Sequence, residues 1–432
     1  MPKLLSNLNP VRRFAIDLTP LKKYPDFRRL WLSGLISFFG SMITMVALPY
    51  QIKELTNSYL AVGAIGAVEL IPLIVFGLYG GVLADRYDRK KLIWFSEASA
   101  LILVLGLLGN SLLGSPKLIF IYVIAALFSA VDGIQRPSAG AILPRLVGHD
   151  DLPAANALMS LRWQLGVILG PAVGGLVIAT YSTSVGFLID AITYLISLYF
   201  LWRVKNIPVT EKSEKPAISA LFEGVRYAFS RKDLLGTYLI DLAAMFFAMP
   251  NALFPFWADQ LDAKWSLGLF YAAGTVGSII ITLTSGWSAN YRWHGRAVIW
   301  AAIGWGLAIA LSGIVHSVWL VLFFLAAAGA SDMVSALFRS AIWNQTIPDE
   351  LRGRLAGIEL LSYSVGPLTG QLRAAMVASA TSLSISVTSG GLMCVIFVAI
   401  LASLLPTFRK YDVETNEFAI SEREKRKNSE NF

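Results

Sequence analysis

The 432-residue sequence is 56% hydrophobic and only 15% charged, with a formal net charge of +8. An ordinary soluble domain carries about 25% charged residues, so this composition excludes a soluble globular protein. Its apolar runs are about 20 residues long, which is enough to cross a bilayer as helices. Because the runs are unbroken rather than alternating, they predict helices and not barrel strands. The predicted fold class is an all-α integral membrane protein.

Residues that usually build disulfides and metal centres are scarce. The one cysteine, Cys394, lies in an apolar run, and the three histidines are scattered without the spacing of metal ligands. We therefore predict no metal and no cofactor. The Lys and Arg residues flank the apolar runs, which indicates loop asymmetry at a lipid bilayer and argues against a nucleic-acid partner.

The chain begins with a polar segment, residues 1–29, which is broken by Pro10, Pro20 and Pro25 and carries seven Lys and Arg residues. This is not the pattern of a cleavable signal peptide, so we expect the segment to stay in the cytoplasm. Twelve apolar spans follow, each long enough for a transmembrane helix. The spans are predicted at 30–52, 59–83, 92–113, 118–142, 153–180, 183–203, 234–258, 265–288, 297–315, 318–343, 355–378 and 384–405.

The distribution of cations tests this topology. With both termini in the cytoplasm, the cytoplasmic segments hold 30 of the 36 Lys and Arg residues, and the outside loops hold three. The positive-inside rule predicts this asymmetry, and a miscounted helix would invert every later loop. We therefore expect both termini on the cytoplasmic side.

The spans form two halves of six, at 30–203 and 234–405, joined by a polar linker at 204–233 and followed by a tail at 406–432. Apolar residues at helical spacing within 217–232 predict a helix that lies in the membrane interface. A plain flexible linker is the alternative interpretation of this segment.

Short motifs recur between the two halves. Gly170-Pro171 in the fifth span recurs as Gly366-Pro367 in the eleventh, 196 residues later, and Ala130-Val-Asp132 recurs as Ala330-Ser-Asp332, 200 residues later. A near-constant offset indicates that the halves are duplicated. In transporters built from such repeats, the substrate site lies at the interface of the repeats near the middle of the membrane.

A dense charge cluster separates the second and third spans. It runs Gly81-Val-Leu-Ala-Asp85-Arg86-Tyr-Asp-Arg89-Lys-Lys91, so only a very short loop joins the two helices. Its four cations mark a cytoplasmic face. An orientation signal alone explains these cations, but it does not explain Gly81 and Asp85 at these positions.

The fifth span carries Gly166, Gly170 and Gly174 at intervals of four residues, which places them on one smooth helix face. Pro171 is expected to kink the helix, because it removes a backbone hydrogen bond. Two interpretations of this face stay open here, a hinge and seal between the halves and ordinary tight packing.

Together these motifs resemble the major facilitator superfamily over essentially the whole chain. The charge cluster is similar to the family signature between helices two and three, with Asp88 where a glycine is usual. The glycine face is similar to the family's antiporter motif, and Pro348–Arg354 is similar to the loop before helix eleven. Phe27–Trp31, Leu48–Gln51 and Val131–Gly133 resemble the drug/proton antiporter branch that contains siderophore and macrolide exporters.

This resemblance implies a monomeric secondary exporter in a bacterial inner membrane, with a twelve-helix fold in two pseudo-symmetric halves. Protons would drive it, and its cargo would be a small amphipathic molecule, either a siderophore of the enterobactin type or a drug. The resemblance also implies that Asp85, near the N-terminal end of helix eleven, latches the cytoplasmic side shut together with Arg86 and Arg89.

Ionisable residues inside the spans are the candidates for proton coupling and substrate binding, because a charge facing lipid costs about 2.5–3.5 kcal/mol on insertion scales. The cavity-lining helices of the resembled fold would place Asp132, Asp241 and Asp332 beside the substrate path, and Glu69 is a further deep carboxylate. Arg162 either meets an anionic cargo or pairs with Glu69 or Asp132. Our hypothesis is that Asp132 or Asp241 carries the proton.

Other functions fit the sequence less well. A multidrug or macrolide efflux pump without a siderophore role is the main alternative, and a membrane protein that transports nothing is a weaker one. The Gly170-Pro171 motif disfavours a nutrient importer. The sequence shows no recognisable nucleophile–base pair, metal cluster or phosphate loop, which disfavours an enzyme.

Overall fold

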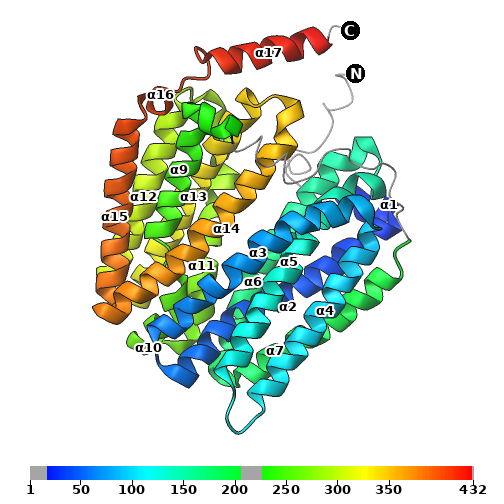
Figure 1. Ribbon diagram of the computed structural model, residues 1–432, viewed down its shortest axis with the longest axis vertical. Coiled ribbons are helices and arrows are strands. Elements are labelled where there is room, and N and C mark those ends of the chain that lie inside the picture. The colour runs from blue at the N-terminus through cyan, green and yellow to red at the C-terminus, as the bar shows by residue number, and fades with distance from the viewer. Residues whose placement is uncertain (1–16, 206–225, 431–432) are drawn as a thin grey trace, which may run out of the picture.

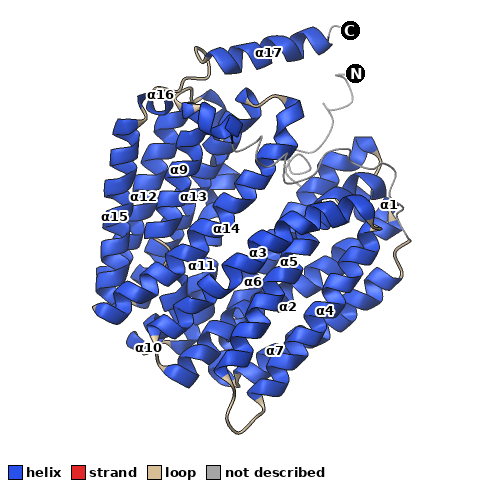
Figure 2. Ribbon diagram, in the orientation of Figure 1, coloured by secondary structure: helices blue, strands red, loops and turns tan. Residues whose placement is uncertain are grey.

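The computed structural model describes residues 17–205 and 226–430, and every regular element within them is a helix (Figure 2). Some side chains inside helices are not described, namely those of residues 78, 81, 82, 84–86, 138–141, 349–363 and 426–430. Most of the interface helix predicted for the linker falls at 206–225, outside the described residues. A helical segment is described at 226–230, where the linker ends.

Long helices run the height of the molecule. They are α2 (Pro25–Thr56), α3 (Tyr59–Arg86), α4 (Arg89–Ser111), α5 (Leu118–Leu146), α6 (Leu152–Thr180), α7 (Thr183–Trp202), α9 (Lys232–Phe247) with α10 (Phe254–Gln260), α11 (Leu267–Thr284), α12 (His294–Ile314), α13 (Val318–Thr346), α14 (Asp349–Ala380) and α15 (Leu383–Leu404). Within the described residues, eleven spans are long and apolar enough to cross a membrane. α14 stands where the remaining predicted span lies, which is consistent with a twelve-helix all-α fold.

Short helices cap or connect these spans. They are α1 (Thr19–Lys23), η2 (His149–Asp151), η3 (Asn251–Leu253), η4 (Lys264–Ser266), η5 (Ser285–Asn290), α16 (Pro406–Arg409) and α17 (Glu417–Glu430).

The predicted seventh span is broken in two. α9 ends at Phe247, and the chain passes through η3 before α10 begins at Phe254. Pro250 causes the break, because it lacks a backbone N–H and disfavours the helical conformation at Met249. Irregular backbone at this depth is tolerated where protein rather than lipid surrounds it, and the neighbouring Ala252 and Leu253 are buried.

The turn between α3 and α4 is as short as predicted, with only Tyr87 and Asp88 between the two helices. Asp88 is the N-cap of α4, and its carboxylate accepts a hydrogen bond from the backbone N–H of Lys91 at 3.2 Å. Aspartate is a favoured N-cap residue. The departure from the usual glycine therefore stabilises the start of α4.

The two ends of the helical bundle are distinct. We name the end that carries α1, α16 and α17 the terminal face, which lies toward the top of Figure 1. The turns after α3, α5, α11 and α13 lie at this face. The turns after α2, α4, α6, α10, α12 and α14 lie at the other end, which we name the opposite face.

The helices form two bundles, α2–α7 and α9–α15, that lie side by side (Figure 1). Contacts within the bundles match: α3 packs on α5 and α4 on α7, as α11 packs on α13 and α12 on α15. Between the bundles, α3 packs on α14 and α6 packs on α11. Because α3 corresponds to α11 and α6 to α14 in the repeat, these two contacts are equivalent under the pseudo-symmetry.

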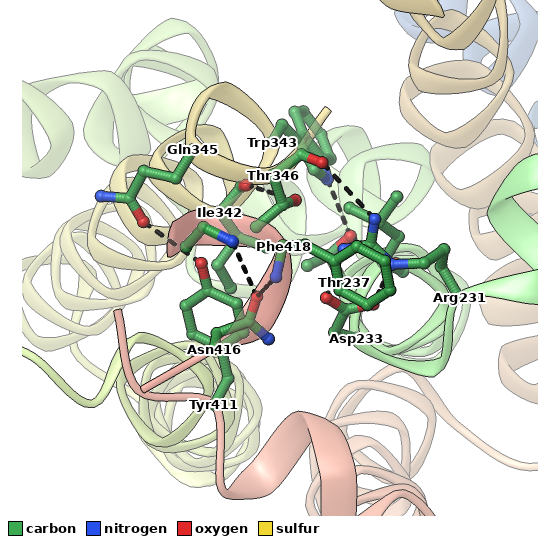
Figure 3. Close-up of polar contacts among 12 residues, drawn as sticks. Arg231, Asp233, Thr237, Ile342, Trp343, Gln345, Thr346, Tyr411, Asn416 and Phe418 are labelled. Atoms are coloured by element: carbon green, nitrogen blue, oxygen red, sulfur yellow. Dashed lines mark hydrogen bonds and ion pairs between the residues drawn. The ribbon is translucent and has the colours of Figure 1, made fainter. Parts of the chain in front are cut away.

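The C-terminal segment packs onto the terminal face of the second bundle. Phe408 is fully buried, and its ring occupies the space beside Gly236, where a Cβ atom would lie only 2.4 Å from the ring. Figure 3 shows a second anchor, in which Arg231 donates hydrogen bonds of 2.9 and 2.6 Å to Asp233 while its guanidinium lies 3.3 Å from the Phe418 ring centroid. The end of the linker, the start of α9 and the start of α17 are thereby joined.

The Arg292–Asp412 ion pair that holds this segment should weaken only under strongly acidic conditions. Arg292 donates hydrogen bonds to Asp412, one of them at 2.9 Å, and lowers the pKa of that carboxyl from its ordinary value. A lowered folded-state pKa means that the stabilisation is present above the ordinary carboxyl pKa near 4 and is lost as the pH falls through the lowered value. We therefore expect the contribution of this pair, measured as the difference between wild type and Arg292→Gln in the rate of proteolysis after the exposed Lys410, to be the same at pH 7 and pH 5.

The Arg292→Gln variant tests the same contact. It should speed cleavage after Lys410 at pH 7 by about two- to fivefold, a modest effect because the pair is partly exposed. Arg296→Gln, which removes an exposed cation one turn further along α12, should leave the rate unchanged. Equal rates in the two variants would contradict a role for the Arg292–Asp412 pair.

Candidate functional site

A cavity of about 610 Å³ lies between the two bundles. Helices α2–α7 build most of its wall. The second bundle contributes Asn251 of η3, Tyr271 of α11, and Ser364, Pro367, Leu368 and Gln371 of α14. The break between α9 and α10 therefore contributes to the cavity wall, because it places Asn251 of η3 there. This is the position at which duplicated halves are expected to hold a substrate.

Glycine-mediated helix crossings join the bundles on the opposite-face side of the cavity. A Cβ atom on Gly175 of α6 would lie 2.2 Å from the backbone nitrogen of Gly268 in α11. A Cβ atom on Gly63 of α3 would lie 2.2 Å from the Cβ atom of Ala375 in α14. Such close backbone approach needs small residues on both sides.

Side-chain contacts complete this closure at the ends of the helices. Lys53 of α2 forms an ion pair with Asp259 of α10, so a charge pair crosses from one bundle to the other. The rings of Tyr59 and Phe256 lie 4.3 Å apart between centroids beside it. The bundles are thus held together at the opposite face.

Three of the predicted residues, Glu69, Asp132 and Arg162, line the cavity. Asp132 forms an ion pair of 2.6 Å with Arg136, one helical turn away, and the two side chains are 45% and 46% exposed. Glu69 lies deeper in the wall, and no ion pair or side-chain hydrogen bond joins its carboxylate to another described residue. Asp132 is therefore neutralised by a local cation, whereas Glu69 is not.

The sequence analysis expects Asp241 and Asp332 beside the substrate path, but this cavity does not include them. Asp241 is 4% exposed and pairs with Arg339 of α13, which is itself 2% exposed. Asp332 lies 3.8 Å from the same guanidinium. Because Arg339 would be a costly unpaired charge inside the bundle, these two carboxylates are engaged in neutralising it.

The expected pairing of Arg162 with Glu69 or Asp132 is also absent. The guanidinium of Arg162 instead lies against α2 at Gly34, where a Cβ atom would be 2.1 Å from its Nη1 atom. Among charged groups, the carboxylate of Glu97 acts electrostatically on Arg162. Sequence spacing could not show this, because the contact depends on how α6 crosses α2.

The glycine face of α6 packs within its own bundle. Cβ atoms on Gly166, Gly170 and Gly174 would meet Phe38, Met42 and Ile43 of α2, respectively. This geometry favours tight packing over a direct seal between the halves. The glycine that meets the other bundle is its neighbour Gly175, and the adjacent carbonyl of Pro171 would lie 2.0 Å from a Cβ atom on Gly268.

The charge cluster is only partly described. The side chains of Gly81, Asp85 and Arg86 are outside the described residues, and Arg89 is the first residue of α4. The latch that the family resemblance implies for this loop stays a prediction.

Buried hydroxyl groups beside the cavity were not recognised from the sequence. Glu97 accepts hydrogen bonds from Ser37 at 3.0 Å, Gln135 at 3.0 Å and Ser197 at 2.7 Å. Residues 33, 37, 41 and 44 of α2 are all Ser or Thr and all line the cavity. Their spacing, close to one helical turn, is the signal that could have revealed a polar stripe on this helix.

Comparison with known proteins decides the family. The sequence profile described as transmembrane secretion effector, a branch of the major facilitator superfamily, matches residues 15–427. The chain belongs to this family. It is therefore a multi-pass membrane transporter, which confirms the resemblance read from the motifs.

Relatives of this secretion effector include the enterobactin exporter EntS of Shigella boydii serotype 18 and that of Escherichia coli O81. Each is 29% identical over 395 residues, which covers 91% of this chain and 95% of the relative. Among solved structures, the nucleoside transporter NupG superposes with a TM-score of 0.67 at 14% identity, covering 89% of this chain and 98% of NupG. A bacterial homologue of the iron transporter ferroportin gives a TM-score of 0.69 at 14% identity, with the same coverages. The structural likenesses establish the fold.

Proposed function

We propose that this secretion effector is a secondary active exporter that moves a small amphipathic molecule out of the cytoplasm in exchange for protons. The observation that carries the proposal is a cavity between two duplicated bundles, which close helix crossings, a charge pair and an aromatic contact join at the opposite face. Contacts of this kind can separate, as alternating access requires.

The terminal face is assigned to the cytoplasm. The segments at this face, including the charge cluster, the linker and the tail, hold most of the Lys and Arg residues of the chain. The closed opposite face is then the outer one. In the described conformation Asp132 lies at the middle of α5, and its exposed partner Arg136 lies one helical turn nearer the terminal face, from which cargo would load.

Two observations support the proposed cargo. Apolar and aromatic side chains in the cavity wall, among them Phe38, Phe128 and Trp163, suit an amphipathic organic molecule. The related proteins are named as exporters of enterobactin, which supports a siderophore. A multidrug or macrolide pump without a siderophore role is the second candidate, favoured by the breadth of the apolar wall. In either case the protein would act as a monomer in the bacterial inner membrane, without a cofactor.

Glu69 is the proposed proton carrier. An ionised carboxylate inside a membrane protein needs either a cation or a proton to neutralise it. Asp132 has Arg136 and Asp241 has Arg339, so the cation is already supplied for both hypothesised carriers. Glu69 faces the cavity without such a partner, so it can exchange a proton without breaking an ion pair.

Transport in everted membrane vesicles tests the proposal. With an imposed pH gradient, acidic inside, the protein should drive uptake of a labelled siderophore or macrolide into the vesicles, and a protonophore should abolish it. Vesicles that lack the protein provide the control. If the uptake rate is the same with and without the pH gradient, transport is not coupled to protons. If the labelled compound moves only out of the vesicles, the protein is an importer.

A further inference from the structure

Arg162 is a cation in the cavity wall that the protein itself leaves without a direct partner. It is the eleventh residue of α6, well inside the membrane span, and its side chain lines the cavity. No ion pair or hydrogen bond joins its guanidinium to another residue that the structure describes. Charged groups at such depth are costly and are normally paired or functional.

Three of the four carboxylates in the cavity wall are committed to other groups, Glu69 being the exception. Glu97 is held by three hydrogen bonds from Ser37, Gln135 and Ser197. Asp190 accepts hydrogen bonds from Thr44 at 2.5 Å and from Thr193 at 3.3 Å. Asp132 is paired with Arg136, as described above. The donors of Arg162 are therefore available to a molecule in the cavity, since a guanidinium presents five N–H groups and accepts nothing.

The packing around Arg162 supports a preformed site. Its guanidinium rests on the α2 backbone at Gly34, a position that any larger residue would occupy with its side chain. Trp163, which follows it on α6, is 56% exposed and also lines the cavity, as do Phe38 and Met159. A fixed cation beside aromatic and apolar surface matches a ligand with an acidic head and an apolar body.

We infer that Arg162 binds the acidic group of the cargo, so that the transported molecule is an amphipathic organic anion. This inference rests on the proposed function as an exporter and narrows its substrate class. Arg162 lies on α6 and the proposed proton carrier Glu69 lies on α3, so different helices carry the anion subsite and the proton site.

Binding of three matched probes tests the inference. The full-length protein in lipid nanodiscs is titrated with pyrenebutyrate, pyrenebutanol and pyrenebutylamine, which share one aromatic body and carry an anionic, neutral or cationic head. Tryptophan-to-pyrene energy transfer above that of protein-free nanodiscs reports binding. The wild type should bind pyrenebutyrate at least about tenfold more tightly than pyrenebutanol, as expected for a charge-assisted hydrogen bond in a cavity.

The variants locate the preference at Arg162. Arg162→Gln should bring the two affinities within about twofold while leaving pyrenebutanol binding unchanged. Gly34→Ala should weaken the preference because the added methyl group displaces the guanidinium, whereas Arg162→Lys should keep most of it. Arg373→Gln is the matched control, because Arg373 is an intramembrane cation that donates to the Phe246 carbonyl outside the cavity wall.

The outcomes are decisive in each direction. A preference for pyrenebutyrate that survives Arg162→Gln, or tightest binding of pyrenebutylamine by the wild type, would overturn the inference. If the Arg162→Gln variant binds none of the three probes, the affinities of the Arg162→Lys and Gly34→Ala variants for pyrenebutyrate and pyrenebutanol test the inference instead. Because binding is measured without any gradient, the result is independent of whether transport is proton-coupled or directed outward.

Discussion

Replacement of Glu69 by Gln is expected to abolish proton-driven transport and to leave cargo binding intact. Glutamine keeps the size of the side chain and its hydrogen-bonding capacity, but it cannot bind and release a proton. Glu69 lines the cavity and has no described cation to neutralise it. The variant should lose gradient-driven uptake in everted vesicles by about 5- to 150-fold, the range of a coupling free energy of about 1–3 kcal/mol.

Exchange of labelled for unlabelled cargo without a gradient should survive in the same variant, because exchange requires alternating access but no net proton movement. Asp150→Asn is a suitable control, since Asp150 is an exposed carboxylate of η2 at the terminal face. If Asp132→Asn abolishes gradient-driven uptake and Glu69→Gln does not, the proton resides on Asp132, and the original sequence-based hypothesis holds.

Replacement of Gly175 by Val should trap the transporter with its opposite face open. The Cβ atom of the new residue would lie 2.2 Å from the Gly268 nitrogen and 2.6 Å from its Cα atom, so α6 and α11 could not keep their present separation. Overpacking of this kind costs about 1–3 kcal/mol. Because the strain falls on the state closed at the opposite face, its population relative to the open state should drop by about 5- to 150-fold.

Cysteine labelling measures this shift. In a Cys394→Ser background, Leu48→Cys provides a thiol in the cavity wall at a site that is 7% exposed. A membrane-impermeant maleimide added from the opposite face should react faster when Gly175→Val is present, and transport should fall. Gly109→Val is the matched control, because a Cβ atom there meets nothing within 4 Å. Unchanged labelling in Gly175→Val would show that the α6–α11 contact does not hold this face closed.

Local properties of the sequence were sufficient for the architecture. Transmembrane spans follow from the length and hydropathy of each segment, so they do not depend on which helices meet. The two-residue turn at Asp88 and the Asp132–Arg136 pair are equally local, since one is a helix cap and the other joins residues four positions apart. The break after α9 was missed although Pro250 marks it, because hydropathy stays high across it.

The partners of the buried charges and the contacts between the bundles were decided only by the tertiary structure. Arg339 pairs with Asp241 from another helix, and Arg162 rests on Gly34 rather than on a carboxylate. Gly175, not its neighbours on the glycine face, meets the other bundle. In a membrane protein both the lipid-facing and the buried surfaces of a helix are apolar, so hydrophobic periodicity does not show which face meets which neighbour. That choice depends on close packing between helices far apart in the chain, and the position of each buried charge follows from it.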